Sequence, residues 1–433
     1  MGITASKITS STNSFRIKEQ DQEYSSLAPT VFVEGDDRER LIRALGVLNS
    51  TAAQQILWVL NPSMTLNVGD ILRVPVLERA RVSTSCVEDL VEYARADWNS
   101  CETSDSFGVN PLLDGSSGDG TLSEAYSRAR RRWGHAVEEV TKLEESLNRA
   151  VIDAYGLDEE LVRAEVSPEA VTLTFNPSYR YRDASKTPAE AEAALRADTV
   201  RDLVSYAVGC AFGRYSPDAP GLILADRGAT LQDYLSKVPS PSFPPDTDNV
   251  VPIVDGDWFE DDIVGLVRQF LRTAFGDRHF EENLEFVTSS LGVKNLRDYF
   301  ITRAGRSKFY DDHVQRYKKR PIYWLFSSPK GSFNALIYMH RYTPSTVSTV
   351  LTYLREYVTK LESSLQQAER AGNAKEADRL RKILVELNEY EHDTLYPKAS
   401  ENVVIDLDDG VKANYPKFGT VLKKITGLEA SGD

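Results

Sequence analysis

Residues 343–390 read TPSTVSTVLTYLREYVTKLESSLQQAERAGNAKEADRLRKILVELNEY, and this stretch decides the fold of the carboxy-terminal part of the chain. Its first half spaces apolar residues by alternating steps of four and three, which places them on one helix face. These residues are Val347, Leu351, Leu354, Val358, Leu361, Leu365 and Ala368. Thr343 before Pro344 is typical of a helix start, and Gly372 with Asn373 can turn the chain. The same spacing resumes at Ala377, Leu380, Leu384 and Leu387. We therefore predict an antiparallel helical hairpin of coiled-coil type over residues 344–395.

Similar patterns predict the elements that precede the hairpin. Thr121 offers an amino-terminal cap with Glu124 in the reciprocal position of a capping box, so a long helix should begin there and end near Gly156. Apolar spacing predicts another helix over residues 34–60, and alternating apolar residues predict an edge strand over residues 66–76. Residues 188–212 are expected to be helical, residues 237–252 to form a proline-rich linker or loop, and the chain from residue 258 to be helical again.

These patterns predict a mixed α/β fold that is predominantly α-helical. A length of 433 residues exceeds what one hydrophobic core usually supports, so we expect several parts. Residues 1–80 should form an α/β domain, residues 81–165 a linker and long connector helix, and residues 166–245 a mixed helical region ending in a proline-rich loop. Residues 246–433 should form a helical domain that contains the hairpin.

Composition and charge exclude several classes of protein. A net charge of -14 argues against a surface broadly adapted to nucleic acid, because phosphate neutralisation needs clustered cations. No run approaches the roughly 18 apolar residues of a membrane-spanning helix, and no basic-then-apolar leader opens the chain, so we expect a cytoplasmic protein without a membrane partner. Cys86, Cys101 and Cys210 have unrelated spacings and the five histidines are scattered, so no disulfide framework or metal site is predicted.

Two local groups of side chains are candidates for DNA binding. Arg316, Lys318, Lys319 and Arg320 lie in a basic segment with interleaved aromatics, a mixture that is typical of phosphate contact and base stacking. An equally weighted alternative is that these cations pair with acids of a neighbouring domain. The second group is dense in short hydrogen-bonding side chains, which read base edges but also fill turns. It consists of Lys7, Thr9, Ser10, Asn13 and Arg16.

No catalytic residue is predicted. Asn176-Pro177-Ser178-Tyr179 is similar to the loop with which amino-methyltransferases hold a flipped base, but serine replaces its second proline. No glycine-rich strand-to-helix turn of the kind that cradles S-adenosylmethionine precedes it. Adjacent carboxylates such as Asp261 and Asp262 are expected on a solvated surface.

Several longer stretches resemble a known family. Residues 316–344, RYKKRPIYWLFSSPKGSFNALIYMHRYTP, are similar to a region near the carboxy terminus of the PglX-like methyltransferases of BREX phage-exclusion systems. Residues 201–226, Phe280-Glu281-Glu282-Asn283-Leu284 and Asp97-Trp98-Asn99 also look like that family, so the resemblance covers nearly the whole chain. It implies a complete enzyme that transfers a methyl group from S-adenosylmethionine to N6 of adenine in DNA. It also implies that residues 1–80 are the carboxy-terminal half of a target-recognition domain, and that the catalytic half and its cofactor lie outside this chain.

Three functions follow as alternatives. The first is a carboxy-terminal methyltransferase fragment that contributes target recognition on double-stranded DNA and docking of other BREX components. The second is a separate specificity subunit that acts in trans with a catalytic methyltransferase chain. The third is a non-enzymatic scaffold or decoy, which the acidic charge and the helical hairpin favour. Whether the chain is itself an enzyme stays open.

Overall fold

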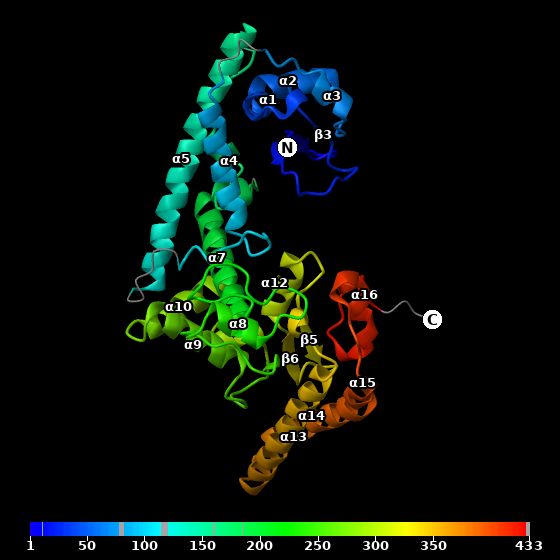
Figure 1. The fold of residues 1–433 in the computed structure, drawn as a ribbon. Coiled ribbons are helices and arrows are strands. Elements are labelled where there is room, and N and C mark those ends of the chain that lie inside the picture. Colours follow the sequence, from blue (N-terminus) through cyan, green and yellow to red (C-terminus); the bar gives the residue numbers. More distant parts are fainter. Residues whose placement is uncertain (11, 78–81, 114–119, 159–160, 184, 430–433) are drawn as a thin grey trace. The chain divides into compact units, whose positions relative to one another are not determined.

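The computed structural model describes residues 1–10, 12–77, 82–113, 120–158, 161–183 and 185–429. The fold is mixed α/β and predominantly helical, as predicted from the sequence (Figure 1). The chain divides into two compact units. Unit 1 comprises residues 1–98 and 130–192, and unit 2 comprises residues 99–129 and 193–433. Helices α4, α5 and α7 each contribute residues to both units.

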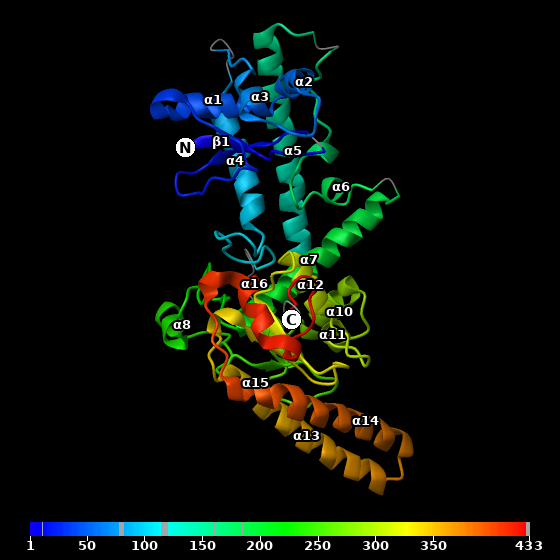
Figure 2. The same cartoon turned by 90° about the vertical axis from the view of Figure 1, so that its right-hand side faces the viewer.

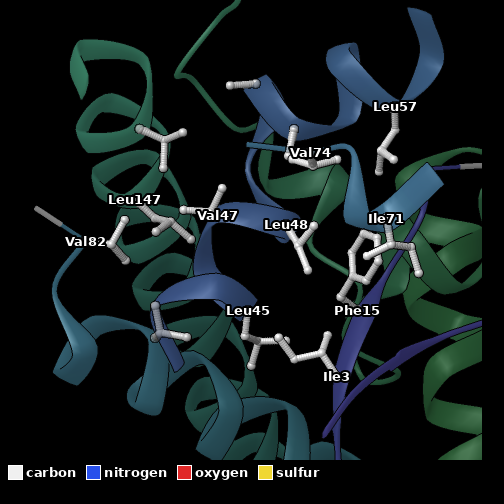
Figure 3. Close-up of a cluster of buried hydrophobic side chains, with 14 of the residues drawn as sticks. Ile3, Phe15, Leu45, Val47, Leu48, Leu57, Ile71, Val74, Val82 and Leu147 are labelled. Atoms are coloured by element: carbon white, nitrogen blue, oxygen red, sulfur yellow. The ribbon is translucent and has the colours of Figure 1, made fainter. Parts of the chain in front are cut away.

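Unit 1 begins with a small antiparallel sheet of order β2-β1-β3. Its strands are β1 (Gly2–Ala5), β2 (Phe15–Lys18) and β3 (Thr30–Val31), and Ile3 pairs with Ile17 on one side and with Val31 on the other. Three helices follow, namely α1 (Arg38–Asn49), α2 (Thr51–Leu60) and α3 (Val68–Leu72). Figure 3 shows how Ile3 and Phe15 of the sheet meet Leu45 and Leu48 of α1 in one buried cluster, which Leu147 of α5 joins.

One sequence prediction in this region is confirmed except for a break, and another is wrong. The helix expected over residues 34–60 is two helices, because the Ser50 hydroxyl caps α2 by accepting from the Ala53 amide. The strand expected over residues 66–76 is the short helix α3. Asn67 and Asp70 form a capping box there, and Asn61 Nδ2 also donates to the Asp70 carboxylate at 2.7 Å. Polar capping therefore prevails over the alternating apolar pattern at this position.

Helices α4 (Thr84–Asn99), α5 (Leu122–Tyr155) and α6 (Pro177–Arg180) complete the regular structure of the part of the chain up to residue 183. The predicted long helix is confirmed as α5. Thr121 Oγ1 accepts from the Glu124 amide at 3.1 Å while Glu124 Oε2 accepts from the Thr121 amide at 3.0 Å, so the capping box is also confirmed. Gly156 ends the helix with a φ of 62°.

Unit 2 contains a second antiparallel sheet that the sequence patterns missed. Its order is β4-β6-β5, with β4 at Val251–Pro252, β5 at Tyr323–Ser327 and β6 at Asn334–Tyr338. Every residue of β5 and β6 is buried, so neither strand shows the apolar and polar alternation from which strands are predicted. Residues 238–250 form an irregular, partly exposed loop, as one of the two predicted alternatives had it, whereas the buried Phe243 and strand β4 pack this segment into unit 2, so it is not a linker.

Helices surround this sheet and extend from it. They are α7 (Pro188–Ala211), α8 (Leu231–Lys237), α9 (Ile263–Phe275), α10 (Phe280–Leu291), α11 (Leu296–Phe300), α12 (Lys308–Arg316), α13 (Thr346–Arg370), α14 (Ala374–Tyr390), α15 (Tyr396–Glu401) and α16 (Gly410–Asn414). Helices α13 and α14 run side by side in both views, which confirms the predicted antiparallel hairpin (Figures 1 and 2). The buried Glu386 of α14 accepts hydrogen bonds from Ser328 Oγ at 2.6 Å and from the Lys330 amide at 2.7 Å, so the hairpin holds the β5–β6 turn.

The described part of the chain contains no helix that combines the length and the apolar character needed to cross a membrane.

Candidate nucleic-acid interface

The basic segment predicted to contact DNA forms a tight turn at the carboxyl end of α12. The Lys319 amide donates to the Val314 carbonyl at 2.8 Å, and the Lys318 amide donates to the Gln315 carbonyl at 3.0 Å. This pair of bonds is the Schellman motif, in which the chain leaves a helix through a residue in the left-handed region. The Arg320 amide donates to the Tyr317 carbonyl at 2.9 Å. Because these three amides are used within the turn, only the side chains can hold an external anion.

Two lysines occupy backbone conformations that favour glycine. Lys318 has a φ of 51° and Lys319 a φ of 63°. The left-handed region costs an L-residue roughly 1–2 kcal/mol, and glycine is the usual residue at this position of the motif. Lys318, Lys319 and Arg320 are all exposed, and none of them makes an ion pair within the described residues. The turn therefore presents three adjacent cations without ion pairs on a strained backbone, a combination that is found at functional sites.

Arg316, the fourth residue predicted in this group, lies in a different environment. Its guanidinium is 17% exposed and forms ion pairs with Asp202 and, at 3.6 Å, with Glu102. Burial opposes the charge, but Glu102 and Asp202 together raise the pKa of Arg316 above its ordinary value. Arg316 thus pairs with acids from distant parts of unit 2, which is the alternative that the sequence left open for the whole segment. It anchors the end of α12 from which the turn projects.

The aromatic residues of the segment belong to the core. Phe309, Tyr310, Tyr323 and Trp324 are buried, so the expectation that they stack on bases is wrong. The rings of Tyr317 and Tyr323 each lie 4.8 Å from the ring of His313, whose Nε2 accepts from the Tyr323 amide at 3.1 Å. Burial, followed by the charges of Arg316 and Arg214, lowers the pKa of His313 well below its ordinary value, so this imidazole is neutral. The rings of His313, Tyr317 and Tyr323 therefore pack against one another and support the turn from the core.

The second predicted group lies in unit 1. Lys7, Thr9, Ser10 and Asn13 are on the connection between β1 and β2, and Arg16 is exposed on β2. The connection is tied to its surroundings through its backbone: the Thr9 amide donates to the Met64 carbonyl, and the Asn13 amide donates to the Gln54 side chain at 3.0 Å. The structure therefore brings these five residues together on one loop and strand. The basic turn belongs to the other unit.

Lys7 also lines a cavity of about 330 Å³ in unit 1. Tyr24 and Phe32, which contribute to its wall, are 71% and 56% exposed. Leu27 and Met64 are exposed as well, at 63% and 57%. A group of exposed large apolar side chains of this kind usually marks a binding surface.

The motif that is similar to a methyltransferase loop has a structural role. Asn176 is buried, and its Nδ2 donates to the carbonyls of Pro168 and Val171 at 2.8 and 2.9 Å. Both amide hydrogens are thus used within unit 1, and the residue precedes the short helix α6. Both sheets of the described chain are antiparallel, whereas a nucleotide-type cofactor is bound at the carboxyl ends of parallel strands. Asn176 and the two described sheets therefore do not form the kind of site at which a doubly wound fold binds such a cofactor. Within the same described ranges, no group of three or more histidine, cysteine, aspartate or glutamate side chains could hold a metal ion.

Comparison with known proteins identifies two relatives of nearly the whole chain. It is 33% identical over 425 residues to adenine-specific methyltransferase BrxX of Escherichia coli O9:H4 (strain HS). It is 32% identical over 418 residues to adenine-specific methyltransferase PglX of Lacticaseibacillus casei (strain Zhang). The matches cover 92% and 91% of this chain, which spans 34% and 32% of the relatives' lengths. No protein-family model matches the chain.

Proposed function

Because this chain belongs to the PglX-like family of BREX adenine-specific methyltransferases, of which it spans about one third, we propose that it supplies DNA recognition and docking rather than methyl transfer. Its substrate is double-stranded DNA, and its site of action is the cytoplasm. S-adenosylmethionine is bound by another part of such an enzyme.

The observation that carries this proposal is the basic turn, Lys318-Lys319-Arg320. In a chain with a net charge of -14, three adjacent exposed cations without ion pairs form a local surface that attracts phosphate. Replacement of the first two residues by glycine would relieve the backbone, so their presence is explained most simply by a use for their charge. Arg316, paired with Glu102 and Asp202, orients the turn without neutralising it.

The test is a mobility shift of the purified chain with a duplex of mixed sequence, titrated with salt. We expect binding that weakens steeply as salt rises, since each neutralised phosphate contributes a slope of about -0.9 in log K against log salt. The variant Lys318→Gln/Lys319→Gln/Arg320→Gln should lower the slope by roughly 2–3. Lys375→Gln, which removes an exposed cation of α14, is the matched control and should bind like the parent. Unchanged binding of the triple variant would overturn the role of the turn.

A second candidate function is suggested by the cavity in unit 1. The exposed Tyr24 and Phe32 around it favour docking of another protein surface, which corresponds to a specificity subunit that acts in trans with a catalytic chain. Mixing the protein with a separately purified catalytic methyltransferase chain tests this. Phe32→Ser should abolish co-elution on gel filtration while leaving DNA binding intact. Partner binding that persists in the complete absence of DNA binding would favour the third alternative, a scaffold or decoy.

A further inference from the structure

A second group of exposed cations lies in unit 1, at the carboxyl end of α6 and just beyond it. Figure 2 labels this helix. Residues 179–182 alternate tyrosine and arginine, and Lys186 follows shortly after. Arg180, Arg182 and Lys186 are exposed, and Tyr179 is 38% exposed. None of the sequence patterns that predicted DNA contacts included these residues. Alternation of two aromatic and two basic side chains is the signal that could have found them.

Tyr181 organises this cluster. The Arg180 guanidinium lies 5.5 Å from the centre of the Tyr181 ring, and the Lys186 ammonium lies 5.6 Å from it. Cation–π attraction holds both groups near the ring, and the charge of Arg180 also acts on the Asp97 carboxylate. Arg182 and Lys186 make no ion pair within the described residues, whereas other exposed arginines of unit 1, such as Arg43 and Arg149, are bound to glutamates.

One acid, Asp183, lies between Arg182 and Lys186, and one of its carboxylate oxygens accepts two local hydrogen bonds. Asp183 Oδ1 accepts from the Ser185 amide at 2.9 Å and from the Ser185 hydroxyl at 2.8 Å. These bonds, together with the charge of Lys186, lower the pKa of Asp183, so its carboxylate stays ionised and offsets one of the neighbouring positive charges. Residues 179–186 carry three basic side chains against this one acid, so the segment still has a net positive charge.

The cluster is fixed to the body of unit 1 from its amino-terminal side. The buried Asp97 carboxylate accepts from both the amide and the hydroxyl of Thr174, and the Arg180 guanidinium donates to the Thr174 carbonyl at 3.4 Å. Phe175 stacks on Trp133 of α5, with ring centres 5.7 Å apart and planes within 13°. The backbone that enters the cluster is thus held by polar bonds and by a stacked aromatic pair, so the cations are displayed on a rigid base.

We propose that this cluster, defined as Tyr179–Arg182 together with Lys186, is a second contact surface for the phosphodiester backbone of DNA. Arg182 and Lys186 hold phosphate oxygens, and the exposed ring of Tyr179 packs against sugar or base edges. Because phosphate contacts carry no sequence information, the cluster positions the duplex and does not read the site. This inference rests on the proposed DNA-binding function, but it concerns residues of unit 1 alone.

The experiment compares Arg182→Gln/Lys186→Gln with the parent chain in the salt-titrated mobility shift. Loss of two phosphate contacts should reduce the salt slope by about 2 and weaken binding on the order of tenfold or more at 0.1 M salt. Tyr181→Leu should weaken binding as well, because it releases Arg180 and Lys186 from their common ring. Lys142→Gln/Arg149→Gln removes two exposed cations of the same unit that are already paired with Glu139 and Glu145, and should leave the slope unchanged.

Each outcome separates this inference from the function on which it rests. If the parent binds DNA and the basic-turn variant weakens binding while Arg182→Gln/Lys186→Gln keeps the full slope, the cluster is no DNA surface and the proposed function stands. If the parent does not bind duplex DNA, both proposals fall. If the cluster variant loses only its binding to a catalytic chain, the surface docks protein and the inference is overturned.

Discussion

The variant Lys318→Gly should make the protein more stable and less able to bind DNA. Lys318 has a φ of 51°, a conformation that destabilises a residue with a Cβ by roughly 1–2 kcal/mol but does not destabilise glycine. Glycine also has more conformational freedom than lysine in the unfolded chain, which lowers the stability of the folded state by about 0.5–1 kcal/mol and offsets part of this gain. We expect a net gain of about 0.5–1 kcal/mol in the free energy of unfolding. For a unit of this size that corresponds to a rise of roughly 2 °C in Tm.

The same variant, Lys318→Gly, is expected to weaken the binding of DNA. Lys318 donates its backbone amide within the turn, so glycine preserves the Schellman bonds and removes only the side chain. One lost phosphate contact should lower the salt slope by about 1 and weaken binding nearly uniformly across sequences. Calorimetric unfolding and the salt-titrated mobility shift of the same preparation measure the two effects.

Two control variants separate backbone strain from charge. Lys318→Gln keeps the strained residue type and removes the charge, so it should lose the same DNA affinity without any gain in stability. Asn402→Gly relieves a φ of 48° at the end of α15 and should stabilise unit 2 slightly without touching DNA binding. Destabilisation by Lys318→Gly, or an unchanged salt slope, would refute the argument that the lysine is retained for its charge.

Three further changes test the fold and its electrostatics. Glu386→Gln should lower the free energy of unfolding by about 2–4 kcal/mol, because the buried carboxylate that accepts from Ser328 loses its charge-assisted bonds. Chemical denaturation measures this loss. Gly305→Ala should lower the free energy of unfolding by at least about 3 kcal/mol. Gly305 has a φ of 71°, and a Cβ added there would lie 1.9 Å from the Lys330 carbonyl oxygen. Soluble yield and Tm measure the effect. Burial raises the pKa of Glu144 to about 7, above the unfolded value, so stability should fall as pH rises from about 4.5 to 7. Glu144→Gln should remove the part of that loss due to Glu144 and add about 2–3 kcal/mol at pH 8, as thermal unfolding across this pH range would show. The part due to Asp246, whose pKa burial also raises to about 7, should remain.

Two of these predictions have a comparison variant, and the third has a clear contradicting outcome. Gly134→Ala, inside α5 with its nearest neighbour 3.9 Å from the new Cβ, should stabilise the helix by about 0.5–1 kcal/mol, in contrast to Gly305→Ala. Glu386→Asp keeps the charge but shortens the side chain, so a cost as large as that of Glu386→Gln would show that reach rather than charge holds the turn. A flat pH profile of the parent between pH 5 and 7 would contradict the desolvation of Glu144.

Short sequence patterns correctly predicted those elements whose stabilising residues lie close together in the sequence. The α13–α14 hairpin was predicted because apolar spacing and a turn at Gly372-Asn373 lie within about fifty residues and agree. The helix start expected at Thr343-Pro344 is wrong, since α13 begins at Thr346 with Ser345 as its N-cap. The capping box at Thr121 and Glu124 was predicted for the same reason. The predicted membership in the PglX-like family, which rested on long stretches of residues, is confirmed.

Features that depend on distant partners could not be predicted from the sequence. Strands β5 and β6 are covered on all sides, so their apolar runs carry no period that distinguishes a strand from a buried helix. The environment of Arg316 is decided by Asp202, which lies 114 residues away, and by Glu102, and no spacing rule connects these three positions. Composition could show an excess of basic residues in this segment but not which of them are neutralised.

The distinction between neutralised and unneutralised cations explains how an acidic chain can still hold a polyanion. Arginines such as Arg43 and Arg149 are bound to carboxylates, so they contribute almost nothing to the field beyond their own surface. Lys318, Lys319 and Arg320 of the turn, and Arg182 and Lys186 near Tyr181, differ from them, because none of these five side chains makes an ion pair within the described residues. The acidic remainder of the surface then repels DNA. In the function that we propose, duplex binding is therefore confined to these two surfaces, each on its own unit, and phosphate contacts position the DNA before any base is read.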